Sequence, residues 1–493
     1  MTTGTPTRKA VKTKVLVGME IHVQLCTASK MFTSAVNGFG GEPNTQVDPV
    51  VLGLPGVLPV INKKAVEGCI KIGMALGCQI ARHTKWDRKS YYYPDLPKNY
   101  QISQYDEPLC GEGVFDLDLD GEVLPVRIRR AHLEEDAGKL LHDAPGGYHI
   151  DHSIVDLNRA GTPLVEIVTE PDFDSGAQVA AFGQALQKIV QFLGVSEGQM
   201  QMGHMRLEPN INVHITDESG NVHKTAITEV KNLNSFSVLQ KAVDYEAVRQ
   251  VKVWEETGQL GRKSTFGWDD QRNATVLQRE KEEAHDYRYF PDPDLVPVEV
   301  DDAWLGRLRA EIGEMPQVRQ KRYRNELGLD EKTAALLAGE RALGDYYEQV
   351  IGAGVEAKRA ANLMEALREV AAEKQQAVED LGVSPAGLAE VAQLVAANKI
   401  AASKEVTKKV MARMSESPGT AEQAATDLQL IQSTDTGALD AAIDAVIAAN
   451  PQPLQDYRGG KQSAVGALVG LVMKQGKGLN PKLVQQRLRE KLS

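Results

Sequence analysis

Apolar and polar residues alternate along two segments in the first 300 residues. Between residues 15 and 24 every odd-numbered position is apolar, whereas Glu20, His22 and Gln24 occupy opposite positions. The segment 206–215 alternates in the same way, with these polar residues on one side: Arg206, Glu208, Asn210, Asn212 and His214. Because side chains of a β-strand point alternately to its two faces, both segments are predicted to be strands with one packed and one accessible face.

The pattern changes in the second half of the chain. Residues 331–449 contain no His or Trp, and 29 of these 119 residues are Ala, which has the highest helix propensity. This stretch is therefore predicted to be helical, with breaks at 382–385, 415–419 and 450–451, where Gly, Ser, Asn and Pro gather.

The predicted fold class is α+β. A sheet-rich N-terminal catalytic domain is expected at residues 1–300, where a third candidate strand, 164–169, places Glu166 beside Leu164 and Val168. A helical domain is expected at 301–410 and a small helical tail at 411–493.

Composition narrows the class of protein further. The chain has 493 residues, with 42% hydrophobic and 25% charged residues, which is typical of a globular protein of several domains. No apolar run approaches the ~20 residues that span a bilayer, and no signal-peptide core follows the N-terminus, so we expect a cytoplasmic protein. The four cysteines form no CxxC pair, which favours reduced, buried thiols.

Two segments carry candidate metal ligands. Glu20 and His22 point the same way on a strand, and a carboxylate beside an imidazole can hold a divalent metal, although a solvated polar face has the same pattern. The segment 132–139 contains three adjacent carboxylates, which repel one another unless a cation, a salt bridge or water relieves them. A solvated acidic turn is the alternative interpretation of that segment.

Two further segments could bind a nucleotide or nucleic acid. The polar side of 206–212, followed by residues 229–234, could hold a nucleotide or could form cross-strand pairs on an exposed sheet. The aromatic segments 88–94 and 286–294 combine Tyr with Lys and Arg, which suits stacking on bases or packing of loops against the sheet. The sequence has no GxxxxGK[ST] or GxGxxG motif, so ATP use would not involve a P-loop or Rossmann turn.

Together these segments resemble, in order from residue 14 to residue 492, the B-subunit family of aspartyl/glutamyl-tRNA amidotransferases. The matching stretches are 18–22, 54–59, 87–89, 100–104, 132–139, 156–159, 161–164, 231–236, 281–283, 286–294, 456–457, 460–461 and 480–484. In this family the N-terminal domain is cradle-like, so the resemblance implies the same shape for residues 1–300.

The resemblance implies a heterotrimer. An amidase (A) subunit hydrolyses glutamine to ammonia, and a small C subunit holds the other two together. The B subunit uses ATP and Mg²⁺ to phosphorylate the side-chain carboxylate of Glu or Asp misattached to tRNA(Gln) or tRNA(Asn). Ammonia arriving through a channel then displaces the phosphate. No membrane or DNA partner is implied, and the alternative is a scaffold subunit that presents tRNA without doing chemistry.

The resemblance also assigns roles to residues. It implies that Glu20, His22 and Glu135 bind the metal, and that Glu166 and Glu229 contribute carboxylates to the metal or ammonia end of a catalytic site. The residues predicted to bind the cofactor ATP are Lys89, Arg206, Glu208 and Asn210.

Two regions bear on other ligands. Some family members carry two cysteine pairs that bind zinc, but this chain has Thr33, Ala35, Asp48 and Val51 there, so no zinc is expected. Residues 451–493 contain eight Lys and Arg against two acidic residues, a charge of +6 in a chain of −11. Such a basic tail is predicted to bind the tRNA backbone, the alternative being a solvated basic helix.

Overall fold

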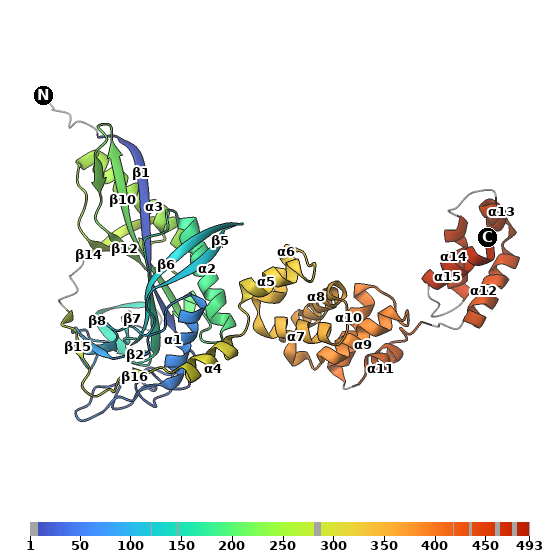
Figure 1. Cartoon of the computed structure of the whole chain (residues 1–493), viewed down its shortest axis with the longest axis horizontal. Coiled ribbons are helices and arrows are strands. Elements are labelled where there is room, and N and C mark those ends of the chain that lie inside the picture. Colours follow the sequence, from blue (N-terminus) through green and yellow to red (C-terminus); the bar gives the residue numbers. More distant parts are fainter. Residues whose placement is uncertain are drawn as a thin grey trace. The chain divides into compact units, whose positions relative to one another are not determined.

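The structure is a computed structural model of the chain (Figure 1). It describes residues 8–119, 121–144, 147–280, 287–417, 419–432, 436–458, 464–475 and 481–492. Residues 281–283, Asp286, residues 460–461 and Asn480, all within the stretches that carry the family resemblance, lie outside the described residues. Contacts between residues divide the chain into two units, Met1–Met315 and Pro316–Ser493.

The first unit is built around a sheet of nine strands among the described residues. Its order is β14-β13-β12-β10-β1-β9-β6-β5, and β11 pairs with β10. The strands are β1 (Ala10–Gln24), β5 (Gly113–Leu119), β6 (Glu122–Glu135), β9 (Pro163–Thr169), β10 (Met205–Asp217), β11 (Val222–Lys224), β12 (Thr228–Lys231), β13 (Ser264–Asp269) and β14 (Ala274–Glu280). Neighbouring strands run antiparallel except β12 and β13, which are parallel.

The alternation in the sequence explains which face of the sheet is packed. In β1, Val17, Met19, Ile21 and Val23 are at most 1% exposed, whereas the polar residues between them lie on the other face. The three strands predicted from the sequence are confirmed by β1, β10 and β9. Fully burying one such side chain contributes about 1.5–3 kcal/mol, so this apolar face fixes the register of the sheet.

Four helices share the core with that apolar face: α1 (Lys63–Ala75), α2 (Gly176–Phe192), α3 (Phe236–Thr257) and α4 (Asp302–Ile312). Helix α3 illustrates how their ends are set. The Ser235 hydroxyl accepts a hydrogen bond from the amide of Val238 at its start, and Gly258 ends it with a positive φ of 74°. The helices therefore bury the apolar face and leave the polar face of the strands for a site.

Three small sheets complete the part of the first unit that the structure describes. Strands β3 (Asp87–Ser90), β4 (Tyr100–Ser103) and β15 (Phe290–Pro291) form one of them, which joins the two aromatic segments. The other two are the pairs β2 (His83–Thr84) with β16 (Val298–Glu299) and β7 (Lys139–Ala144) with β8 (Tyr148–Asp156).

The second unit is helical throughout the part that the structure describes, which confirms the prediction for residues 331–449. Its α-helices are α5 (Pro316–Asn325), α6 (Glu331–Gly339), α7 (Arg341–Gly352), α8 (Ala357–Lys374), α9 (Pro385–Ala396), α10 (Lys404–Glu416), α11 (Ala421–Asp427), α12 (Thr436–Ala449), α13 (Pro451–Arg458), α14 (Ala464–Gln475) and α15 (Pro481–Leu492). The three predicted breaks coincide with helix ends before α9, α11 and α13. The α+β fold class is thus confirmed.

The second unit contains two separate apolar clusters. One runs from Tyr323 to Ala425, and the other joins residues of α12, α14 and α15 between Leu439 and Leu492. The domain boundaries predicted after residues 300 and 410 stay predictions. None of the described helices is both long and apolar enough to cross a membrane.

Candidate functional site

A row of polar residues crosses the open face of the main sheet. His22 on β1 lies opposite Arg206 on β10 and Glu166 on β9. Glu166 in turn lies opposite His132 on β6. Because the strands pair in this register, four residues that are up to 184 positions apart in the sequence meet on one face.

The centre of this row is a cluster of carboxylates and imidazoles. His22 Nε2 lies 3.5 Å from Glu134 Oε1 and 3.7 Å from Glu166 Oε2, and His132 Nε2 lies 3.5 Å from Glu166 Oε2. Glu134, Glu166 and His132 are buried. The Nδ1 atoms of His22 and His132 are buried and have no hydrogen-bond partner among the described residues.

The protonation states of this cluster are set mainly by burial. Burial lowers the pKa of His22, and it lowers the pKa of His132 to about 4, so both imidazoles are neutral. Burial raises the pKa of Glu134, whereas for Glu166 attraction to neighbouring positive charges such as Lys89 and Arg130 outweighs burial and lowers the pKa. Neutral imidazoles beside carboxylates form an environment that favours a bound cation.

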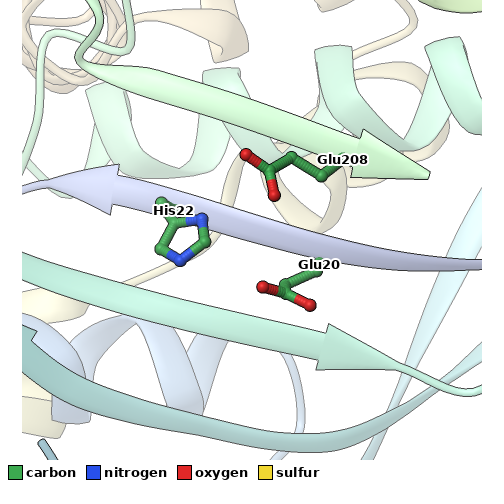
Figure 2. A group of neighbouring side chains, drawn as sticks. All are labelled: Glu20, His22 and Glu208. Carbon is green, nitrogen blue, oxygen red and sulfur yellow. The ribbon is translucent and has the colours of Figure 1, made fainter. Parts of the chain in front are cut away.

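A second group of potential ligands shares His22. Figure 2 shows Glu20 and His22 on one strand and Glu208 on its neighbour; each offers a ligand atom, and these atoms lie within 4.8 Å of one another. Glu20 and Glu208 are directly opposite in the register, an arrangement of like charges that is unfavourable without a cation. Lys231 supplies one such cation, since its Nζ lies 2.7 Å from Glu208 Oε2.

These residues fit a divalent cation. His22, Glu134 and Glu166 form the other group of three whose ligand atoms lie within 4.8 Å of one another. Carboxylate oxygens suit Mg²⁺ or Mn²⁺, and a neutral imidazole is a ligand for transition metals such as Mn²⁺. The buried Nδ1 atom of His22, which has no partner in the described part of the chain, agrees with a role for this ring beyond packing.

Glu135 is not part of either group, so the structure does not bring the predicted set Glu20, His22 and Glu135 together. Its carboxylate pairs with the Lys98 ammonium and accepts a hydrogen bond of 2.9 Å from the Ile102 amide. The reason is an irregularity in the pairing of β6 between Ile128 and Arg130, which reverses the alternation. Glu134 therefore takes the place on the open face that the prediction gave to Glu135.

The remaining predicted residues lie around the cluster. Asn210 pairs with Glu229 across β10 and β12, and Glu229 Oε2 accepts a hydrogen bond of 3.0 Å from Thr265. Burial would lower the pKa of Lys89, but Glu134 and Glu166 outweigh it and raise the pKa. Lys89 is therefore a positive charge held at the carboxylate cluster.

A cavity of about 1030 Å³ adjoins the sheet face. Arg206 and Glu208 line it, together with Lys231, the segment 232–234 and the glycine-rich loop 37–41. Arg206 makes a bidentate pair with Asp136: its Nη1 donates to Oδ2 at 3.0 Å and its Nη2 to Oδ1 at 3.2 Å. The cavity thus has cations in its wall and is large enough for a nucleotide.

Sequence reasoning missed four residues of this site: His132, Glu134, Asp136 and Lys231. The three adjacent carboxylates mark the segment 132–139 as a candidate, but only the strand register shows that His132 and Glu134 share a face with Glu166. Lys231 follows Glu229 at the spacing of a strand, so the same period of two could have identified it.

The positions of the zinc-binding cysteines of some relatives carry a hydrogen-bonded turn here. The Thr33 hydroxyl donates to the Asp48 carboxylate, which also accepts a hydrogen bond of 2.9 Å from the Val51 amide. These contacts join the two ends of the segment, and the absence of zinc stays a prediction.

Comparison with known proteins defines first the class of this fold and site. The family profile described as the GatB/GatE catalytic domain matches residues 15–306, and the profile described as the GatB domain matches residues 345–492. The first match covers the whole of the polar sheet face and its cavity.

Curated relatives extend the match to the full chain. The B subunit of the aspartyl/glutamyl-tRNA(Asn/Gln) amidotransferase of Moorella thermoacetica is 45% identical over 483 residues, which are 97% of this chain and 99% of the relative. The proteins of the same description from Caldicellulosiruptor saccharolyticus and Listeria innocua are each 44% identical over 485 residues, with the same coverage. This chain therefore belongs to the family of aspartyl/glutamyl-tRNA(Asn/Gln) amidotransferase B subunits. The resemblance found in the sequence and the predicted enzyme class, one component of a ligase-type amidotransferase, are confirmed.

Proposed function

We propose that this chain uses ATP to activate the side-chain carboxylate of Glu or Asp esterified to tRNA(Gln) or tRNA(Asn), and then transfers ammonia to it. A carboxylate reacts poorly with ammonia because its leaving group would be oxide. Phosphorylation provides a good leaving group, and phosphoryl transfer requires positioning and charge neutralisation more than a protein nucleophile. Family membership supports the overall reaction, and the cluster around His22 is the single observation that supports its chemistry on this chain.

We further propose Mg²⁺ as the cofactor at this cluster. His22, Glu134 and Glu166 would hold it, with Glu20 and Glu208 contributing on the side of the cavity. When bound, the ion would neutralise phosphate charge during transfer. The protein's own part is to keep the carboxylates together in a buried place, where their mutual repulsion creates the affinity for a cation.

The cavity is the proposed site of ATP. Arg206, paired with Asp136, and Lys231, paired with Glu208, both line it. The phosphate groups would therefore lie against residues whose positive charges are balanced by neighbouring carboxylates. The loop 37–41 on the same cavity has no Cβ at Gly38, Gly40 and Gly41, which would allow phosphate to approach their backbone amides closely. Lys89, which the sequence predicted at ATP, is not among the residues that line the cavity. We propose instead that it holds the substrate carboxylate beside the cluster, where Glu134 and Glu166 keep it positively charged.

The partners follow from the same proposal. Ammonia would come through a channel from an amidase (A) subunit, with a small C subunit completing a heterotrimer in the cytoplasm. Buried carboxylates such as Glu229 would line the path of ammonia, which is bound by hydrogen-bond acceptors. The site has to exclude water, because water would hydrolyse the activated intermediate. The basic tail is proposed to bind the tRNA backbone.

The test is the release of labelled phosphate from γ-labelled ATP by the purified complex. We expect release to require Glu-tRNA(Gln) or Asp-tRNA(Asn), and correctly charged tRNA to give none. Assaying each misacylated tRNA separately identifies the substrate. Amide formation without ATP consumption would contradict the proposal. So would ATP consumption that does not depend on which amino acid is attached to the tRNA.

A further inference from the structure

The two aromatic segments of the sequence meet in the small sheet beside the site. Phe290 on β15 lies opposite Arg88 on β3, and this pairing brings the tyrosines near residue 90 next to those near residue 288. Three of their rings form a continuous series with the ring of Tyr105, which follows β4, and this series is here called the tyrosine wall: Tyr91, Tyr105, Tyr287 and Tyr289. The rings of Tyr105 and Tyr289 are stacked, with centroids 4.2 Å apart and an angle of 14° between their planes.

The tyrosine wall adjoins the carboxylate cluster. The Lys89 ammonium lies 5.2 Å from the centroid of the Tyr287 ring. The same ammonium interacts electrostatically with Glu134, Glu166 and Tyr289. The Lys89 ammonium therefore lies near the wall and interacts electrostatically with the carboxylates of the proposed reaction centre, so a molecule lying along the wall would have one end near those carboxylates.

The rim of the wall holds an aromatic ring that packing does not explain. Tyr92 is 71% exposed, whereas its neighbour Tyr91 is itself part of the wall and packs against Tyr287. The Arg288 guanidinium lies 5.5 Å from the centroid of the Tyr92 ring. Arg288 holds a positive φ of 47°, an unfavourable conformation for a residue with a Cβ.

An exposed tyrosine with a guanidinium beside it has the composition of a site for single-stranded nucleic acid. In such sites a base stacks on the aromatic ring while the cation meets the phosphate. The cavity proposed for ATP is separate in its lining: none of the described residues that line it is a tyrosine, and neither Tyr92 nor Arg288 is among them. A base stacked on Tyr92 would therefore belong to a molecule other than the ATP, and adenine is the base that we expect there.

We propose that Tyr92 and Arg288 bind the 3′-terminal adenosine of the charged tRNA, with the adenine stacked on Tyr92 and a phosphate of the 3′ end at Arg288. This inference rests on the proposed function. The ester-linked amino acid would extend along the tyrosine wall, and its side-chain carboxylate would reach Lys89 beside Glu134. Tyr92 and Arg288 thus position the substrate and take no part in the chemistry.

The experiment removes the two partners of the contact separately and together. Binding of uncharged tRNA, intact or lacking its terminal adenosine, is measured to the complex carrying the native chain or Tyr92→Ala. We expect loss of the adenosine to weaken binding to the native protein by roughly 5- to 100-fold, the range for one base stacked on an aromatic residue. The Tyr92→Ala protein should bind both tRNAs equally, with the weaker affinity.

Two matched variants define the cause. Tyr92→Phe retains the ring and should retain the preference for intact tRNA. Tyr245→Ala removes an exposed tyrosine from α3, in the helical layer of the same unit, and should change nothing. In turnover assays Tyr92→Ala should raise the KM for charged tRNA while leaving the KM for ATP unchanged.

Other outcomes would overturn the inference. A Tyr92→Ala protein that still distinguishes the two tRNAs would show that the adenosine binds elsewhere. A raised KM for ATP alone would assign the ring to the nucleotide, and failure to co-purify with the amidase would assign it to a protein–protein interface. Each leaves the proposed function standing, whereas that function fails if the native complex shows no ATP turnover dependent on misacylated tRNA.

Discussion

Two adjacent carboxylates at the end of β6 lie in opposite environments. Glu135 is held by the Lys98 ammonium and the Ile102 amide, so its charge is satisfied within the protein. Glu134 faces His22 and shares the open sheet face with Glu166, where burial raises its pKa. The difference indicates that a satisfied carboxylate serves the structure, whereas a buried carboxylate among neutral imidazoles is available to a cation.

The largest expected effect is on catalysis. Glu134→Gln should lower the rate of ATP turnover with misacylated tRNA by about 10²–10³-fold, the usual cost of removing one group that stabilises charge in the transition state. Glu135→Gln, the matched neighbour, should keep ATP turnover within a few-fold, because its side chain does not face the cluster. Phosphate release measures both, and equal losses in the two variants would remove the distinction.

The next effect is on stability, where we expect the Glu135 variant to lose more than the Glu134 variant. Glu135→Ala leaves the ammonium of Lys98, 8% exposed, without its carboxylate, and should lower the free energy of unfolding by about 3 kcal/mol. Glu134→Gln replaces a carboxylate whose charge burial disfavours, so we expect a change below about 1 kcal/mol.

Tryptophan fluorescence during urea unfolding suits this comparison. All four tryptophans, the last of them Trp304, lie in the first unit, so the signal reports on that unit alone. A Glu134→Gln protein that is the less stable of the two would contradict the assignment of Glu135 as the structural member.

A smaller effect is expected from metal binding. Mg²⁺ at about thirty times its dissociation constant should stabilise the native first unit by about 2 kcal/mol relative to a sample with chelator. Glu134→Gln should lose this gain and Glu135→Gln should keep it. The shift of the urea midpoint by magnesium is the measurement, and a gain that survives Glu134→Gln would place the ion elsewhere.

The smallest effect concerns the tail, where basic residues that form ion pairs can be compared with basic residues that form none among the described residues. Arg487 pairs with Asp440 on α12, whereas Arg489 makes no ion pair among the described residues. Arg489→Ala should weaken tRNA binding a few-fold and reduce the salt dependence by about one phosphate contact, and Arg487→Ala should do less. Binding titrations at several salt concentrations test this, and equal salt slopes in the two variants would argue against it.

The tail also shows how structure corrects a charge count. Helix α12 shares its apolar cluster with α14 and α15, so Asp440 and Asp444 belong beside the basic residues. Lys491 Nζ lies 2.6 Å from Asp444 Oδ1. Counted from residue 436, the tail carries +4 rather than +6, because these two aspartates precede residue 451. Lys461 and Lys477 lie outside the described residues, as do the side chains of Arg458 and Lys482.

The sequence predicts the part of the site on the regular strands β1 and β10, but not the part on β6, whose pairing is irregular. The period of two in β1 and β10 identifies Glu20, His22, Arg206 and Glu208 correctly as one polar face. In β6, Val126 and Ile128 enter the core before the irregularity, and odd-numbered residues enter it afterwards. One extra residue in a strand reverses its two faces. The family resemblance assigned the metal to Glu135, and no sequence pattern marked the irregularity that places Glu134 on the face of His22.

The most direct measurement is anomalous diffraction from crystals of the complex soaked in Mn²⁺, which substitutes for Mg²⁺ and scatters anomalously. We expect one strong peak within coordination distance of His22 and Glu134, with Glu166, Glu20 or Glu208 completing its ligands. A peak at Glu135, or an ordered sheet face without any peak, would contradict the assignment of the metal to the His22 side.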